Sequence, residues 1–285
     1  MFSNSSYNYF TKLIQAIIFA DDAVSMNFGY MLAYNGSSNL RYIKFPKNYT
    51  NSIYCGNLNY AGFQHYVDCT NYNELINKAS NLHQLRILVN YIRKKLTVNN
   101  LNASVWSRDA FYGIFEEIEI NNLNVLTYFD TAFSGTIVKK VTINTQINAT
   151  EMASAFNSCT VKEIIGTEYL GSRTSDVNGT DMFSLCANLT SPIIMYAKFT
   201  KFGCYGTSIR RQPITSIRLM NPNSTFSGTS PQIDVSYNSL DATALNTLFG
   251  DLPVLSGKTI KITGNPGAGT CDTSIATSKG WTVQN

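Results

Sequence analysis

Three glutamates in the run FEEIEI are the candidates for chemistry that needs paired carboxylates. Glu117 and Glu119 are two residues apart, so in an extended strand both face away from Ile118 and Ile120. Glycosidases need two carboxylates roughly 5 to 9 Å apart, which makes glycoside hydrolysis compatible with this spacing. The interpretation that we favour is simpler: with Glu116, they form the solvated face of an alternating strand.

A nucleophilic triad needs a histidine as its base, and the chain has two histidines. His65 lies four residues before Cys69 in FQHYVDC; on one strand the two would lie about 13 Å apart, too far for proton transfer. His83 lies in an amphipathic helical pattern, where we expect it to be exposed. We therefore predict that neither histidine is catalytic.

No metal or cofactor site is expected from the spacing of potential ligands. The adjacent Asp21 and Asp22 are an isolated acidic pair, typical of a loop or helix end, and no His, Asp or Glu set has metal-ligand spacing. No cysteine pair has CxxC spacing, and buried free thiols are favoured over the disulfides that an even count permits. The six are Cys55, Cys69, Cys159, Cys186, Cys204 and Cys271.

The loop GNPGAGT follows a strand-like run and precedes a short helical pattern at 273–279, which is the order found in phosphate-binding loops. The lysine of such a loop is absent, because Thr270 and Cys271 follow Gly269. Too few residues follow the loop to build the parallel α/β sheet that carries such sites. Anion binding by the backbone amides stays open as an alternative.

We expect this loop to be the turn after the last strand of the fold. Gly264, Gly267 and Gly269 would take positive φ values, and Pro266 would stiffen the bend. The segment after it would fold over the end of the molecule, with Trp281 buried.

The composition favours a protein of an extracellular or virion surface over a cytosolic enzyme. Charged residues make up 14% of the chain and the net charge is +4, so the polar surface must consist mainly of Asn, Ser, Thr and Tyr. The basic cluster YIRKKL (91–96) is interpreted as a solvated helix face, and no nucleic-acid binding is expected. The start of the chain lacks a secretory signal, and its apolar run 13–20 is too short to span a bilayer. We expect a helix over 9–20, and expect the segment 7–20 to dock the protein on its assembly.

Short strand-like runs recur at a nearly fixed interval, which decides the predicted fold. Ile118, Val141 and Ile164 are spaced 23 residues apart; Ile194 to Ile217 repeats that interval, and Ile43 to Val67 gives 24. The runs are YIKFP (42–46), YVDC (66–69), EIEIN (117–121), KVTIN (140–144), EIIGT (163–167), PIIMY (192–196), SIRLM (216–220), QIDVS (232–236) and TIKIT (259–263).

Between these runs lie segments with apolar residues at helical spacing, such as Phe129 with Phe133 and Met152 with Phe156. A strand and a short helix per unit predict an α/β leucine-rich-repeat solenoid, with a parallel sheet on one face, short helices on the other, and a C-terminal cap. The segments are 29–40, 127–135, 150–159 and 180–189.

Two regions depart from the period. A longer amphipathic helix is predicted over 73–95, and a full helix over 239–253 with Asp241 near its start. The predicted organisation is an N-terminal docking segment (1–25), first repeats (26–72), a helical insertion (73–105), the main solenoid (106–249) and a C-terminal capping unit (250–285).

The run Phe183-Ser-Leu-Cys186-Ala-Asn-Leu189 resembles the Phe-x-x-Cys-x-x-Leu turn of BspA-like leucine-rich repeats. Phe156 and Cys159 form a weaker copy, as does the segment 31–45. The C-terminal stretch 245–283 resembles the closing unit of such repeats in proteins of gut Bacteroidetes and of their bacteriophages, including crAss-like phages. The resemblance covers 26–72 and 106–285; it implies a solenoid built for contact and supplies no catalytic residues.

These observations predict a non-enzymatic bacteriophage virion protein, a fibre, spike or decoration component. The expected partners are other virion proteins and a host receptor or glycan, with a homo-oligomeric assembly, no cofactor and no membrane span. The alternative is a bacterial cell-surface adhesin of the BspA-like type. A third hypothesis is a glycan-active enzyme that uses Glu117 and Glu119.

Overall fold

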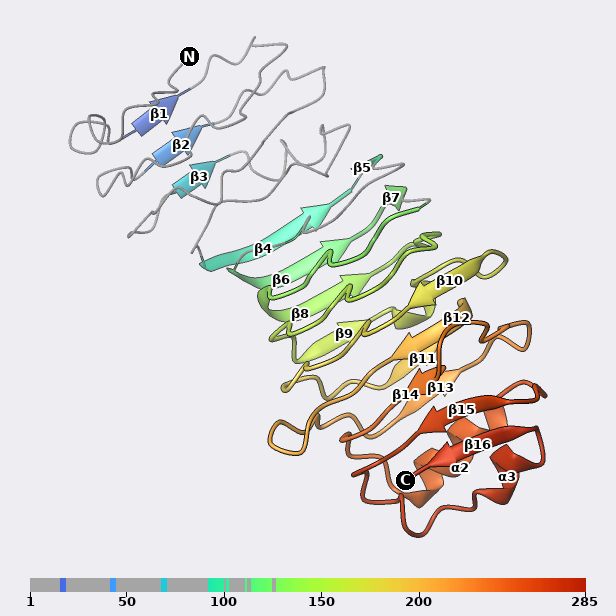
Figure 1. Ribbon diagram of the computed structural model, residues 1–285. Coiled ribbons are helices and arrows are strands. Elements are labelled where there is room, and N and C mark those ends of the chain that lie inside the picture. The colour runs from blue at the N-terminus through green and yellow to red at the C-terminus, as the bar shows by residue number, and fades with distance from the viewer. Residues whose placement is uncertain are drawn as a thin grey trace, which may run out of the picture.

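The computed structural model is a solenoid of parallel β-strands (Figure 1). It describes residues 16–18, 42–44, 68–70, 92–99, 101–102, 111, 114–124 and 127–285. Strands from successive coils pair side by side, so each sheet runs along the solenoid axis. The four-stranded sheet contains β4 (Ile92–Val98), β6 (Ile114–Ile120), β8 (Ile137–Ile143) and β9 (Glu163–Ile165). The five-stranded sheet contains β10 (Asp176–Gly179), β12 (Lys198–Gly203), β14 (Ile233–Asp234), β15 (Lys258–Lys261) and β16 (Trp281–Gln284).

Three smaller sheets complete the described strands. An N-terminal sheet joins three short strands, and two further sheets consist of two strands each. A 3-10 turn, η3 (Thr167–Tyr169), follows β9. The N-terminal sheet consists of β1 (Ala16–Ile18), β2 (Tyr42–Lys44) and β3 (Asp68–Thr70). The two-stranded sheets are β5 (Leu101–Asn102) with β7 (Leu123–Asn124), and β11 (Ile193–Met195) with β13 (Ile217–Leu219).

The strand register confirms the central repeat of the sequence. Ile118 pairs with Val141, and Val141 pairs with Ile164, and all three side chains are buried. Each of the nine predicted runs overlaps a strand. Two intervals were wrong: the partner of Ile217 is Ile193, one residue earlier than predicted, and Ile43 pairs with Cys69, two residues after Val67.

The predicted short helices are wrong in the three described segments 127–135, 150–159 and 180–189, which form turns. Thr131, Ser154 and Asp181 have φ values of 54° to 56°, which lie in the left-handed region and interrupt any right-handed helix. The backbone bonds instead to the next coil; for example, the Phe133 amide donates to the Ala155 carbonyl at 2.7 Å.

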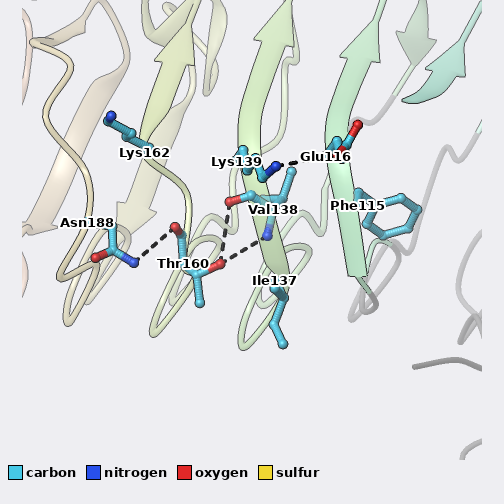
Figure 2. Close-up of a pocket in the computed structure, with 8 residues that line it drawn as sticks. All are labelled: Phe115, Glu116, Ile137, Val138, Lys139, Thr160, Lys162 and Asn188. Atoms are coloured by element: carbon cyan, nitrogen blue, oxygen red, sulfur yellow. Dashed lines mark hydrogen bonds and ion pairs between the residues drawn. The ribbon is translucent and has the colours of Figure 1, made fainter. Parts of the chain in front are cut away.

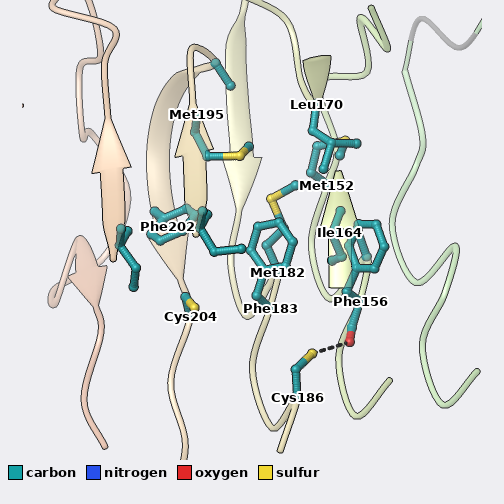
Figure 3. Packing of buried hydrophobic residues seen from close by; sticks show 14 of the residues in the cluster. Met152, Phe156, Ile164, Leu170, Met182, Phe183, Cys186, Met195, Phe202 and Cys204 are labelled. Carbon is teal, nitrogen blue, oxygen red and sulfur yellow. Dashed lines mark hydrogen bonds between the residues drawn. The ribbon is translucent and has the colours of Figure 1, made fainter. Parts of the chain in front are cut away.

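Phenylalanines of successive coils lie next to one another in the core, and Figure 3 shows Phe156, Phe183 and Phe202 among them. Phe111, Phe133 and Phe156 stack with ring centroids 4.5 and 4.6 Å apart, and the column continues through Phe183 to Phe202 at 5.3 and 6.3 Å. Stacked aromatic rings attract one another, so each ring stabilises the placement of the ring in the next coil. The column therefore couples adjacent coils along the axis.

Two N-terminal predictions also need correction. Residues 92–98, which include the last part of the predicted helix 73–95, form strand β4, in which Leu96 and Val98 are buried and Lys95 is exposed. Ala16–Ile18, inside the predicted helix 9–20, form strand β1 and pair with Tyr42–Lys44. The remaining residues of these two predicted helices lie outside the described part of the chain.

The C-terminal helix is confirmed as α2 (Ala242–Asp251), and the Asp241 carboxylate accepts a hydrogen bond from the Ala244 amide at 2.7 Å, as expected of an N-cap. The helix packs against β13. A second helix, α3 (Ser274–Thr277), precedes β16. Trp281 is buried as predicted, lies edge-on to Phe226 and donates from its indole nitrogen to the Pro253 carbonyl at 2.9 Å.

Candidate functional site

A groove of about 720 Å³ crosses four successive coils at the points where their strands begin (Figure 2). It spans the starts of β6 and β8, the turn before β9 and the turn before β11. Because the coils stack in parallel, the groove follows the solenoid axis. The lining residues are Phe115, Glu116, Ile137, Val138, Lys139, Thr160, Lys162 and Asn188.

The groove combines apolar and polar side chains. Phe115 and Val138 are buried, whereas Ile137 is 48% exposed although it is a large apolar residue. The Lys139 ammonium lies 3.4 Å from the carboxylate of Glu116; the Lys139 side chain is largely exposed to solvent, and that of Glu116 is partly exposed. A ligand could therefore meet an apolar contact and ionised groups of both signs in one place.

The backbone beside the groove is already hydrogen-bonded. The Thr160 hydroxyl accepts from the Val138 amide at 3.1 Å and donates to the Val138 carbonyl at 3.4 Å. The Asn188 side-chain amide donates to the Thr160 carbonyl at 3.4 Å. Recognition at this position would depend on side chains rather than on vacant backbone groups of a strand edge.

Glu117 and Glu119 lie on the outward face of the four-stranded sheet, as the alternating pattern predicts, whereas the strand pairing skips Glu116, which lines the groove. Lys95 lies 2.6 Å from Glu119 and 3.7 Å from Glu117, so one ammonium serves both carboxylates. Its hydrogen bond with Glu119 raises the pKa of Lys95 above the ordinary value. The next outward pair is Lys140 with Glu163, at 3.4 Å.

The strand register turns these charges into a row. Lys95 is the register partner of Glu117, which is the partner of Lys140, which is the partner of Glu163. Signs alternate from coil to coil, so every carboxylate has a neighbouring ammonium. The other three members of this row, Lys95, Lys140 and Glu163, were not predicted from the sequence, although the spacing of 22 to 23 residues along the row carries the signal.

The glycine loop is a structural turn. Gly264 has a φ of 75° as predicted, but Gly267 and Gly269 do not have positive φ values, so that part of the prediction was wrong. Gly267 serves a different purpose, because a β-carbon there would lie 2.2 Å from the Ala242 nitrogen at the start of α2. The amides of Gly267, Ala268, Thr270 and Cys271 all donate to backbone carbonyls, which leaves them unavailable to a phosphate.

Cys159, Cys186 and Cys204 are buried free thiols, as predicted, while Cys271 is partly exposed. Burial raises the pKa of Cys159 to about 12 and raises that of Cys186 well above its ordinary value. Such thiols are poor nucleophiles and poor metal ligands near neutral pH. Within the described residues, no group of three or more His, Cys, Asp or Glu side chains could hold a metal ion.

Some sequence candidates lie outside the described residues, namely Asp21, Asp22, Cys55, His65 and His83. In the part of the chain that the structure covers, no helix has the length and apolar character to cross a membrane. Comparisons with protein-family models, with curated proteins and with solved structures find no match to this chain. Any function must therefore be argued from the groove, the outward face and the repeat.

Proposed function

We propose that this chain is a non-enzymatic structural protein of a bacteriophage particle, a fibre, spike or decoration component that makes contacts through its solenoid. The observation that carries the proposal is the outward row of charges, in which each carboxylate pairs with a lysine of the adjacent coil. These charges pair between coils and align them, whereas catalysis would require them to converge on a reacting group.

The resemblance to BspA-like leucine-rich repeats is the reason for proposing a repeat protein of bacteriophages or Bacteroidetes. The Phe-x-x-Cys motif that carries this resemblance also has a physical role in the stack. Phe183 and Cys186 are buried, and the Cys186 thiol donates to the Phe156 carbonyl of the preceding coil at 2.9 Å (Figure 3). The motif thus joins coils through both a ring and a thiol. In the same proposal, α2, α3 and β16 form the cap of a leucine-rich-repeat solenoid, supported by the packing of α2 on β13.

The test is the composition and structure of purified particles from the virus that carries this gene. We expect peptides of the chain at a fixed ratio to the capsid protein, and electron microscopy with a specific antibody should label one particle position. Mass determination in solution should give a homo-oligomer. A stable monomer that is absent from particles would overturn the proposal.

A second candidate, a bacterial cell-surface binding module, is favoured by the groove, since an axial groove with mixed side chains suits an extended ligand. The two proposals differ in location. Fractionation of cells that express the gene would place an adhesin in the outer surface fraction without phage particles, whereas a virion protein would sediment with the particles.

The glycan-active enzyme is tested at the residues that suggested it. Glu117→Gln and Glu119→Gln remove the carboxylates and leave the side-chain volume unchanged, and Glu163→Gln is the matched control from the same row. If turnover of any glycan were found and then lost in the first two variants alone, the non-enzymatic proposal would be wrong.

A further inference from the structure

The groove repeats one ionisable position in three successive coils. The register places Glu116 beside Lys139, because their neighbours Phe115 and Val138 are partners, and it places Lys139 beside Lys162, because Lys140 and Glu163 are partners. Adjacent strands lie about 4.8 Å apart. A ligand extended along the axis therefore meets one charged side chain per coil.

The same coils provide the remaining contacts that a sugar needs. Ile137 offers a half-exposed apolar surface beside Lys139, which suits the apolar face of a pyranose ring. Asn188 and Glu116 provide hydrogen-bond donors and acceptors on either side of it (Figure 2). An apolar contact with several surrounding polar groups is the usual composition of a small-molecule site.

An extended peptide added as a strand fits the groove less well. Strand addition uses vacant amides and carbonyls at a sheet edge. At this position the Thr160 hydroxyl occupies both the amide and the carbonyl of Val138. The ligand must be recognised by side chains, and a polyhydroxylated chain offers them many partners.

The charge of the groove selects among glycans. Its lining contains two lysines and one glutamate. Glu116 faces Lys139 at 3.4 Å, and Lys162 follows at the next coil. The excess of positive charge favours a ligand with carboxylates or sulfates along its length.

We infer that this groove binds an extended acidic glycan that runs along the solenoid axis, with its anionic groups at Lys139 and Lys162 and a sugar ring against Ile137. The inference rests on the proposed contact function and gives it a ligand class. It applies to a virion protein and to a cell-surface module alike.

The experiment is calorimetric titration of the full chain with acidic hexasaccharides: oligogalacturonate, oligomeric α2,8-linked sialic acid and a heparin fragment. We expect at least one to bind, more weakly at high salt because exposed charges are screened. The corresponding disaccharide should bind more weakly because it reaches fewer coils. Cellohexaose, which is neutral, should bind more weakly than the acidic chain.

Variants locate the site. Lys139→Gln and Lys162→Gln should each weaken binding about tenfold, since each removes a charge-assisted contact, and Ile137→Ser should weaken it as well. Lys198→Gln, on β12 and outside the groove, is the matched control and should bind like the native chain. Thermal melts verify that each variant is folded.

The inference is overturned if none of the three acidic probes binds, if cellohexaose binds equally well, or if the control loses as much affinity as the groove variants. Each of these results leaves the particle assignment unaffected, because that assignment is measured by particle composition. Conversely, if the chain is absent from particles but binds an acidic probe, the virion proposal is wrong and the groove inference stands.

Discussion

Six residues in three successive coils hold a left-handed backbone, and only one of them is glycine. They occupy two equivalent positions per coil, four residues apart, and their φ values lie between 54° and 66°. Side chains disfavour this region by about 1–2 kcal/mol per residue, so the inter-coil hydrogen bonds must hold them there. The residues are Thr131 and Gly135, Ser154 and Ser158, and Asp181 and Leu185.

Thr131 is the most strained of these residues because it is β-branched. Thr131→Gly should raise the free energy of unfolding by about 0.5–1 kcal/mol, the relief of strain exceeding the extra entropy of glycine in the unfolded chain. Urea denaturation measures the change. Thr142→Gly is the control: it lies in β8 and has no positive φ, so the same substitution should destabilise it. Equal effects at both positions would contradict the strain argument.

The buried thiols predict a pH dependence of stability. The pKa of Cys159 is raised to about 12 in the folded chain by burial, against an ordinary value of 9.0. The folded state thus disfavours the thiolate, so this contribution to stability is complete below pH 9 and is lost as the pH rises from 9 toward 12. Denaturation at pH 8 and at pH 10 should show that the free energy of unfolding falls less between these two pH values in Cys159→Ala than in the native chain. An identical loss in both chains would count against this assignment.

At the scale of elements, side chains cap both ends of α2. Asp241 caps its first turn, and the Lys279 ammonium donates to the carbonyls of Phe249, Gly250 and Leu252 at 3.1, 2.5 and 2.8 Å. A cation at a helix C-terminus satisfies carbonyls that have no partner within the helix and interacts favourably with the helix dipole. One side chain before β16 therefore fixes the end of α2.

Replacing that ammonium tests its importance. Lys279→Met keeps the length of the side chain and removes three hydrogen bonds, so we expect a loss of about 1–3 kcal/mol in the free energy of unfolding. Hydrogen exchange should accelerate first in the last turn of α2. Lys258→Met, in β15, is the matched control and should stay within about 0.5 kcal/mol of the native chain. If both variants behave alike, Lys279 does not hold the helix.

The elements also show what the sequence could predict. The strands were predictable because apolar residues alternate and repeat, as Ile118, Val141 and Ile164 do. The turns were not, because Thr, Ser and Asp carry positive φ values there without the usual glycine signal, and phenylalanines four apart imitate a helix. The outward charges of the glutamate strand were predicted, whereas the groove depends on the alignment of four coils and has no local motif.

At the scale of the whole molecule, opposite charges pair between coils along both large sheets. Besides the row in the first sheet, Asp176 pairs with Lys198 at 2.8 Å and Asp234 with Lys261 at 3.5 Å. Each of these pairs joins register partners of adjacent strands. Exposed ion pairs contribute little singly, so we interpret them as a means of aligning the coils rather than as the main source of stability.

Stability in such a stack is approximately the sum of each coil and its contacts with its neighbours, so the last coil has a defined role. A chain that ends after Gly264 lacks α3, β16 and Trp281, which uncovers Phe226 and the edge of β15. Removing a buried tryptophan alone costs about 3–5 kcal/mol. We therefore expect the truncated chain to melt at a lower temperature and to expose apolar surface that binds a hydrophobic dye, while deletion of Asn285 alone should have little effect. If the truncated chain melts like the full one, the terminal unit stabilises only itself and does not cap the solenoid.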